Sequence, residues 1–430
     1  MRDANQAPSR TLTARLDSLA RAHRYMIVIA LMLLVSGLGF LRLEYRTVTF
    51  DESVSISYAH ESWVSLWHIV ARSDPNMSLY HAALKIWTGL YGDSVLAVRS
   101  LSVVAAVLCV PVVYAIGVRL FGVFAGLLAG LLVSTNVFFL HYSQEARAYA
   151  LVTLLTALST YFFLVEAERP GRWSRAGYVA SSVLAFYAHF FVVWVLLVHV
   201  GTLAAAKRRG AMSRSWLACY GAMTALAAPM AYLVLTEGAG TIAWLGEPGW
   251  RAIPATYAQL AGDSFLHLGA VVALCMLALR RAAHSQRLAF GLAFTAAWAF
   301  LPVLAAFAVS QVKPVFLAKY LIVSLPAMAL LAAGAISCLR PVSAALAAAC
   351  VLVALSVPEL RSSYRVLQVM DSTRYRSSRP SISDRDSRTP HTSRTIVTGP
   401  SFVSSTAIRA PKTPPATPTP AFARAVQKAS

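Results

Sequence analysis

Runs of about 20 apolar residues recur along this chain and constrain its fold more than any other feature. Of its 430 residues, 57% are hydrophobic and only 13% are Asp, Glu, Lys or Arg. A hydrocarbon layer roughly 30 Å thick requires about 20 apolar residues for each spanning helix, and helices satisfy their own backbone groups there. We therefore expect an all-α polytopic membrane protein.

Eleven apolar segments are expected to be transmembrane helices. They cover about residues 25–41, 99–118, 123–141, 149–166, 176–188, 189–206, 216–235, 265–279, 288–309, 318–338 and 341–357. The fifth and sixth segments form one unbroken apolar run, which we divide at Ala188-His189. With the N-terminus inside, this division keeps the basic run Lys207-Arg208-Arg209 on the inner side, as the positive-inside rule expects.

The net charge of +20 could indicate a nucleic-acid partner, but the position of the charges favours a different interpretation. Before the tail, Arg and Lys are concentrated in the N-terminal arm and in short loops on one side of the expected bundle. This asymmetry is the orientation signal of a membrane protein. We therefore expect a multi-pass protein of the inner (plasma) membrane, in contact with membrane lipids and not with nucleic acid.

The chain divides into three regions. They are a cytoplasmic N-terminal arm (1–24), a transmembrane domain (25–360) and a basic, low-complexity tail (361–430). Within the transmembrane domain, the first outer loop (42–98) interleaves aromatic and polar residues, which predicts amphipathic helices at Ser53–Arg72 and Leu79–Tyr91. The tail is rich in Ser, Arg, Thr and Pro, so we expect it to be disordered.

Polar residues from several segments gather on the outer side of this topology, where Asp51 and Glu52 open the first outer loop. The other residues of this set are Asp74, Asn76, Tyr80, His81, His141, Gln144, Glu145, Arg147, Tyr149, His189, Lys313, Lys319 and Tyr320. Ionisable residues that face a shared cavity at the ends of membrane helices are functional candidates. A carboxylate can act as a general base for a hydroxyl group, and Arg147, Lys319 and His189 can hold a phosphate. We interpret this set as a site for a lipid-phosphate substrate. The sequence has no Gly-rich phosphate-binding loop, so we do not expect a nucleotide donor.

Several motifs resemble those of the family 39 glycosyltransferases, which belong to the GT-C superfamily with the protein O-mannosyltransferases and the aminoarabinose lipid A transferases. The motifs are Phe50-Asp51-Glu52, Asn76-Met77-Ser78-Leu79-Tyr80 with Trp87, the run from Ser143 to Leu151, Tyr187-Ala188-His189-Phe190, and Lys313 to Leu321 with Leu325-Pro326. The resemblance covers about residues 25–340. Two departures are Met77-Ser78, where many relatives have Pro-Pro, and Lys319, where many have Arg.

The resemblance implies a GT-C-type bundle and an inverting transferase of the hexosyl or mannosyl type. Its donor would be a polyprenyl-phosphate sugar, and its acceptor a hydroxyl group of a protein, lipid or polysaccharide on the extracytoplasmic side. Asp51 would be the general base, with Glu52 shaping the site. Arg147 and Lys319 would hold the donor phosphate, and Asn76 and Tyr80 would line the cavity.

Other interpretations stay open. The chain could be a transporter or a lipid-linked sugar flippase, although its ionisable residues gather at one end and no internal repeat is seen. It could also be an inactive relative, with a reading-frame change near residue 370 as a further hypothesis. Arg147 could be an interfacial anchor, Lys319 a snorkelling lysine, and Glu145 a structural partner of Arg147.

No resident cofactor is expected. His60, His68 and His81 share one loop but not the spacing of metal ligands. A divalent metal therefore remains an option that the ligand spacing does not support.

Overall fold

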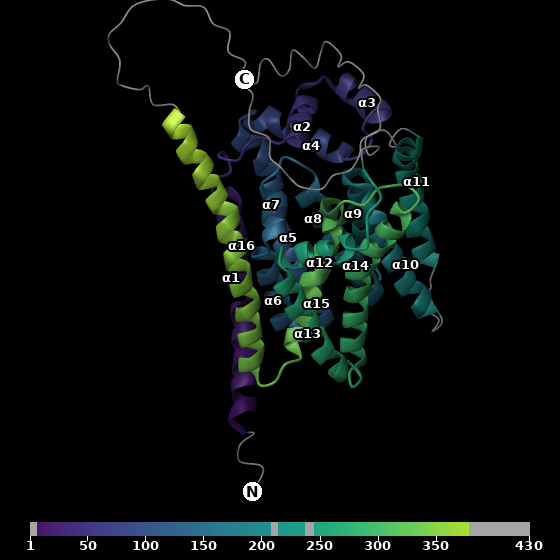
Figure 1. Cartoon of the computed structure of the whole chain (residues 1–430). Helices are drawn as coiled ribbons and strands as arrows, with labels where there is room; N and C mark the ends of the chain where they lie inside the picture. Colours follow the sequence, from purple (N-terminus) through teal and green to yellow (C-terminus); the bar gives the residue numbers. More distant parts are fainter. Residues whose placement is uncertain (1–6, 208–213, 237–244, 378–430) are drawn as a thin grey trace, which may run out of the picture. The chain divides into compact units, whose positions relative to one another are not determined.

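The structure is a computed structural model that describes residues 7–207, 214–236 and 245–377 (Figure 1). The chain divides into a first unit, Met1–Val369, and a second, Met370–Ser430, of which only residues 370–377 are described. The helices are α1 (Ala7–Phe40), α2 (Phe50–His60), α3 (Trp63–Arg72), α4 (Ser78–Tyr91), α5 (Val95–Phe121), α6 (Val123–Ser134), α7 (Val137–Ser143), α8 (Tyr149–Glu168), α9 (Arg172–Ala188), α10 (Val193–Lys207), α11 (Arg214–Thr236), α12 (Ala252–Gly262), α13 (Phe265–Ala282), α14 (Gln286–Ser310), α15 (Leu325–Ser337) and α16 (Val342–Ser377), with the 3-10 helices η1 (Phe190–Val192) and η3 (Ala318–Ser324).

The described residues confirm the prediction of an all-α polytopic membrane protein. Eight of their helices are long and apolar enough to cross a membrane, and α6 with α7 forms a ninth candidate that is bent by 59°. Neither α9 nor α10 meets that criterion of length and composition. The number of eleven spans therefore remains a prediction.

The predicted division of the long apolar run is confirmed at the predicted residue. Helix α9 ends at Ala188, and His189 has an extended backbone with φ −166° and ψ 125°. The chain then forms η1 before α10 begins at Val193. This break puts the His189 side chain at the junction of two helices.

Helix α5 lies at the centre of the bundle, where it contacts α1, α6, α8 and α15. Gly117 of α5 faces Gly126 of α6 so closely that a Cβ atom on Gly117 would lie 2.6 Å from the Gly126 Cα. Helices in a membrane associate through such close packing of small residues. The two glycines thus set the spacing between α5 and α6.

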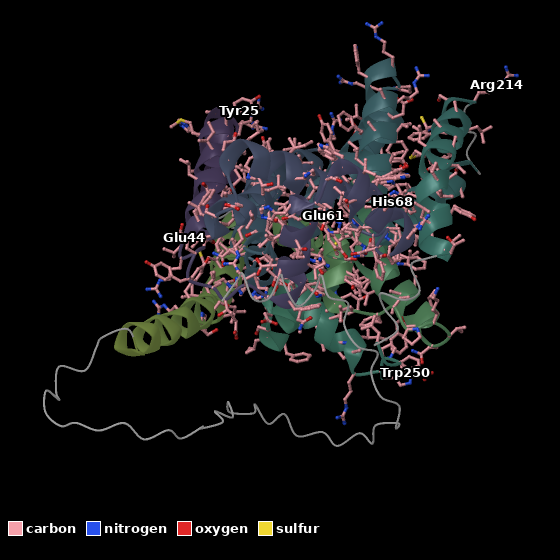
Figure 2. All side chains as sticks on the ribbon, turned by 90° about the horizontal axis from the view of Figure 1, so that it is seen from above. Tyr25, Glu44, Glu61, His68, Arg214 and Trp250 are labelled. Atoms are coloured by element: carbon pink, nitrogen blue, oxygen red, sulfur yellow. The ribbon has the colours of Figure 1, made fainter. Side chains whose placement is uncertain are left out.

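The helices of the first outer loop lie together at one end of the bundle (Figure 1). Figure 2 looks along the bundle and shows Glu61 and His68 near its middle. The stretch predicted as one amphipathic segment, Ser53–Arg72, forms two helices, because Glu61 leaves the helical conformation and the Ser62 hydroxyl caps α3 by accepting the Ser65 N–H at 3.0 Å. Helix α3 is amphipathic: it buries Leu66 and Val70 and exposes the two tryptophans Trp63 and Trp67.

Helix α16 continues past the predicted tail boundary at residue 361 and ends at Ser377. The Tyr364 hydroxyl donates to the Leu38 carbonyl at 2.7 Å, and Arg42 donates to the Tyr364 carbonyl at 3.1 Å. These contacts with the end of α1 support helix beyond the composition change. The rest of the predicted disordered tail, 378–430, lies outside the described residues.

The predicted N-terminal arm, 1–24, overlaps the first helix. Helix α1 begins at Ala7, and its candidate membrane-crossing part is Arg21–Phe40. Residues 1–6 lie outside the described part of the chain.

Candidate functional site

A cavity of about 510 Å³ is formed by residues of α2, the α3–α4 loop, the end of α11 and η3. This volume is within the usual range of ligand pockets. Its charged lining side chains are Asp51, Asp74, Arg147, Lys313 and Lys319, and its apolar wall includes Phe50, Val54, Phe190, Leu235 and Val315. A charged interior beside an apolar wall suits a ligand with a polar head and a hydrocarbon part.

Asp51 reaches the cavity from the first turn of α2. A capping box starts this helix: the Thr49 hydroxyl accepts the Glu52 N–H at 3.3 Å, and the Glu52 carboxylate accepts the Thr49 N–H at 3.0 Å. Because negative charge is favourable at a helix N-terminus, Asp51 has a suitable position there. Its Oδ2 accepts a hydrogen bond from Lys319 Nζ at 2.5 Å.

The charge of Asp51 is therefore stabilised by its neighbours. Partial burial alone would raise the pKa of Asp51, but the hydrogen bond from Lys319 and the positive charges of Arg147 and Lys319 hold it below its ordinary value. Asp51 is ionised at neutral pH and could accept a proton from a hydroxyl group.

Glu52 does not line the cavity. Its carboxylate is 1% exposed and accepts hydrogen bonds from Arg99 Nε at 2.7 Å and from an Arg99 terminal nitrogen at 2.9 Å. It also accepts the Ala146 N–H at 2.9 Å. Burial would raise the pKa of Glu52, but these hydrogen bonds keep it below its ordinary value. Glu52 thus ties α2 to α5 and to the segment before α8, and this geometry is that of a positioning residue.

Arg147 brings a buried positive charge to the cavity wall. One terminal nitrogen donates to the Asp51 carbonyl at 3.2 Å and to the Ser55 hydroxyl at 3.1 Å. Among the described residues, no carboxylate lies within ion-pair distance of Arg147, and its Nε has no hydrogen-bond partner. Glu145, which the sequence offered as its partner, pairs with His141 at 3.3 Å instead. The guanidinium charge is therefore available to an anionic ligand.

Lys319 and Tyr320 enter the cavity from η3. Lys319 Nζ lies 5.8 Å from the centre of the Tyr149 ring, a distance typical of a cation–π contact. The Tyr320 ring stacks on Tyr149 with centres 6.5 Å apart and contacts His189 at 4.8 Å. Tyr149 is fully buried behind Tyr320, so it supports the wall without lining it.

His189 is buried beside the cavity and contacts Asn76, which lines it. The two side chains are 3.4 Å apart between Asn76 Nδ2 and His189 Nε2, while His189 Nδ1 accepts the Phe191 N–H at 3.3 Å. Since Nδ1 is the acceptor, Nε2 carries the proton of the neutral ring, and the Asn76 amide satisfies both groups when its oxygen faces Nε2. His189 therefore orients Asn76, a geometry different from direct phosphate binding.

Four other predicted site residues lie behind the cavity wall. Tyr80 is fully buried and shares a hydrogen bond with Ser102 at 3.0 Å, and His81 is buried against Tyr58. Gln144 donates to three carbonyl oxygens at the end of α1 and accepts from Arg46 at 2.9 Å. With Glu145 engaged by His141, these residues hold the segments around the cavity and do not form its surface.

Two charged residues of the cavity were expected on the outer face but were given no role in the predicted site. Lys313 and Asp74 both line it. Asp74 lies two residues before Asn76 at the start of a motif that the sequence had singled out, and Lys313 begins another, so both had a readable signal. Burial and the negative charge of Asp51 raise the pKa of Asp74 to about 6, against the opposing effect of Arg147.

The cavity thus combines three cationic side chains with two carboxylates. Such a set can bind an anionic phosphate and receive a proton from a hydroxyl group. Within the described ranges, no three His, Cys, Asp or Glu side chains are grouped so that they could hold a metal ion.

Comparison with known proteins supports the resemblance seen in the motifs. The family model described as dolichyl-phosphate-mannose-protein mannosyltransferase matches residues 75–234. This region includes Asn76, Arg147 and His189 but neither Asp51 nor Lys319. No curated protein matches the sequence.

The fold is similar to that of ArnT from Cupriavidus metallidurans. The apo structure of ArnT matches with a TM-score of 0.57 at 18% identity, and the structure bound to undecaprenyl phosphate with 0.53 at 16% identity. The matches cover 75% of this chain and 61% and 62% of ArnT, so this chain spans about three fifths of that protein. The GT-C-type fold implied by the motifs is confirmed.

Proposed function

We propose that this protein is an integral membrane glycosyltransferase that moves a sugar from a polyprenyl phosphate to an acceptor hydroxyl group. The observation that carries the proposal is the single cavity that Asp51, Arg147 and Lys319 share beside an apolar wall. The match to a mannosyltransferase family model and the fold shared with ArnT, which binds undecaprenyl phosphate in one structure, support it.

The donor phosphate would bind between Arg147 and Lys319. Arg147 offers a guanidinium group that no carboxylate among the described residues neutralises, and a guanidinium can bind phosphate with two parallel hydrogen bonds. Lys319 adds a point charge from η3, and Lys313 adds another from the preceding loop. The lipid chain would leave along the apolar wall near Phe190 and Leu235.

Asp51 would act as the general base. Phosphate bound to Lys319 would compete with Asp51 for the ammonium group, so donor binding would release the carboxylate towards the acceptor. The acceptor oxygen then attacks the anomeric carbon from the face opposite the phosphate, which inverts that centre. The bond to the phosphate oxygen breaks, and its electron pair leaves with the polyprenyl phosphate.

The reaction would take place on the extracytoplasmic face of the membrane. The cavity is at the end of the bundle that carries α2, α3 and α4. Other basic residues lie at the ends of candidate spans: Arg119 and Arg280 in the last turns of α5 and α13, Arg287 in the first turn of α14, and Arg340 between α15 and α16. Basic residues in short loops favour the cytoplasmic side. In this orientation the acceptor, a protein, lipid or polysaccharide, would be outside the cytoplasm.

Transfer can be tested with the purified full-length protein in liposomes. Labelled polyprenyl-phosphate mannose is the first donor, and a cell-envelope extract supplies acceptors. We expect polyprenyl phosphate and labelled acceptor to form in equal amounts. Movement of intact donor across the bilayer without cleavage would instead establish the flippase. If a panel of sugar donors shows neither transfer nor movement, the protein is an inactive relative.

A further inference from the structure

Asp74 contributes a second carboxylate to the same cavity as Asp51. The two carboxylates differ in their contacts. Asp51 is bound by Lys319 at 2.5 Å, whereas the Asp74 side chain makes neither a hydrogen bond nor an ion pair with any residue that the structure describes. The cavity therefore holds one engaged carboxylate and one without a partner.

The loop that carries Asp74 is well held. The Asp74 N–H donates to the Ile69 carbonyl at 3.0 Å, which closes the end of α3, and Pro75 follows directly. Two residues later, Met77 is buried with φ 62°, a left-handed conformation that is uncommon for residues other than glycine. Strained backbone of this kind is concentrated at functional sites. The carboxylate of Asp74 is thus carried by a loop whose backbone is held on both sides of it.

We infer that Asp74 is a proton-relay residue of this site, which receives the acceptor proton from Asp51 and passes it to water at the mouth of the cavity. The inference rests on the proposed glycosyl transfer. In that reaction the acceptor O–H bond breaks as its oxygen bonds to the anomeric carbon, and the sugar–phosphate bond breaks with its electron pair on phosphate. The proton moves to the Asp51 carboxylate, then to Asp74, and finally to solvent, which restores both carboxylates.

The electrostatic surroundings give this relay its direction. The titratable and charged groups around the cavity are Asp51 and Tyr58 of α2, Arg147 before α8, His189 after α9, and Lys313, Lys319 and Tyr320 around η3. Burial, helped by the charge of Asp51, raises the pKa of Asp74 to about 6, whereas the pKa of Asp51 stays below its ordinary value. A proton therefore moves downhill from Asp51 to Asp74. Above pH 6 Asp74 is ionised and can accept it, and below pH 6 the relay is already protonated.

The test is the pH profile of kcat/KM for transfer from labelled polyprenyl-phosphate mannose, measured between pH 5 and 8 on full-length protein in liposomes. We expect the native rate to fall as the pH drops below about 6. Asp74→Asn should be slower at pH 7.5, on the order of 100-fold, and should lack that decline. Asp74→Glu should retain the decline, because it keeps a carboxylate on the same loop.

Asp93→Asn is the matched control, since Asp93 is exposed, belongs to the same outer loop and only approaches His60 at 3.8 Å. It should behave as the native protein. An Asp74→Asn variant with the native pH profile would overturn the relay while leaving the glycosyl transfer intact. So would a variant in which only the donor KM rises, because that result would make Asp74 a sugar-binding residue. A native protein without turnover would overturn the proposed function and the relay together.

Discussion

Lys319 Nζ and Asp51 Oδ2 are 2.5 Å apart, although 268 positions separate the two residues in the sequence. The contact joins the first turn of α2 to η3 across the cavity. It also connects the two proposed tasks of the site, because one partner is the proposed base and the other a proposed phosphate ligand. A substitution of Lys319 should therefore also affect the proposed base function of Asp51, and a substitution of Asp51 should affect phosphate binding by Lys319.

Lys319→Gln should weaken donor binding and change the pH dependence together. The variant loses a cation for the phosphate, so we expect the donor KM to rise about 10- to 100-fold, as for the loss of a charged hydrogen bond. Without the Lys319 hydrogen bond, the pKa of Asp51 should rise, because this contact opposes the effect of burial. In the Asp74→Asn background, which lacks the decline assigned to Asp74, the low-pH decline of kcat/KM that remains should then begin at a higher pH.

Lys85→Gln is a suitable control for Lys319→Gln. Lys85 donates to the Ala59 carbonyl in the outer loop and does not line the cavity. A Lys319→Gln variant with native donor KM and a native pH profile would contradict the assignment of Lys319 to the phosphate.

Arg147→Lys should preserve the positive charge but lose the hydrogen-bond geometry of the guanidinium group. Lysine cannot donate to the Asp51 carbonyl and the Ser55 hydroxyl while also presenting two parallel donors to a phosphate. We expect the donor KM to rise about tenfold or more in steady-state kinetics, with a smaller change in kcat. Arg251→Lys, at the exposed start of α12, is the control. A native donor KM for Arg147→Lys would contradict phosphate binding by Arg147 and would favour its interpretation as an interfacial anchor.

Glu52→Gln should damage the fold as well as the activity. Glu52 and Arg99 are both 1% exposed, and removal of one member of a buried ion pair typically costs about 3–5 kcal/mol. We expect a lower unfolding temperature in detergent for Glu52→Gln, with partial recovery in the double variant Glu52→Gln, Arg99→Gln. Glu44→Gln, on an exposed residue labelled in Figure 2, should leave the unfolding temperature unchanged.

The pH dependence of stability offers a second check on Glu52. Its pKa is below the ordinary value in the folded state, so its contribution to stability is present above that ordinary value and is lost as the pH falls below it. The Glu52→Gln variant should lack this part of the acid destabilisation. Equal unfolding temperatures of the native protein and Glu52→Gln at pH 7.5 would show that the pair is not required for the fold.

Hydrophobic patterning predicted most of the fold. The apolar runs located the helices of the bundle, and the charged loops around Lys207 supported the break at Ala188-His189 that α9 and η1 have. Composition did not predict the extent of α16, which continues past the composition change to Ser377 and contacts the end of α1 through Tyr364 and Leu38.

The candidate site was predicted at the level of segments and less well at the level of individual side chains. The resemblance implied that Asp51 is the base and that Glu52 shapes the site, but it did not predict that the capping box turns Glu52 inwards to Arg99, a partner 47 positions away. The Thr49-x-x-Glu52 pattern is a readable sign of that geometry. Which residues of a segment face a cavity depends on packing, so Asp74 and Lys313 were expected on the outer face but their place in the cavity lining came from the structure.

The central claim is that Asp51 activates the acceptor while cations hold the donor, and Asp51→Asn tests it most directly. The amide replaces the carboxylate with nearly the same shape, so insertion and thermal stability should stay close to native, as they should for the control Asp93→Asn. Purified Asp51→Asn should still bind labelled polyprenyl-phosphate mannose but transfer sugar on the order of 10²- to 10⁴-fold more slowly than the native protein. Normal turnover by purified Asp51→Asn would contradict the account.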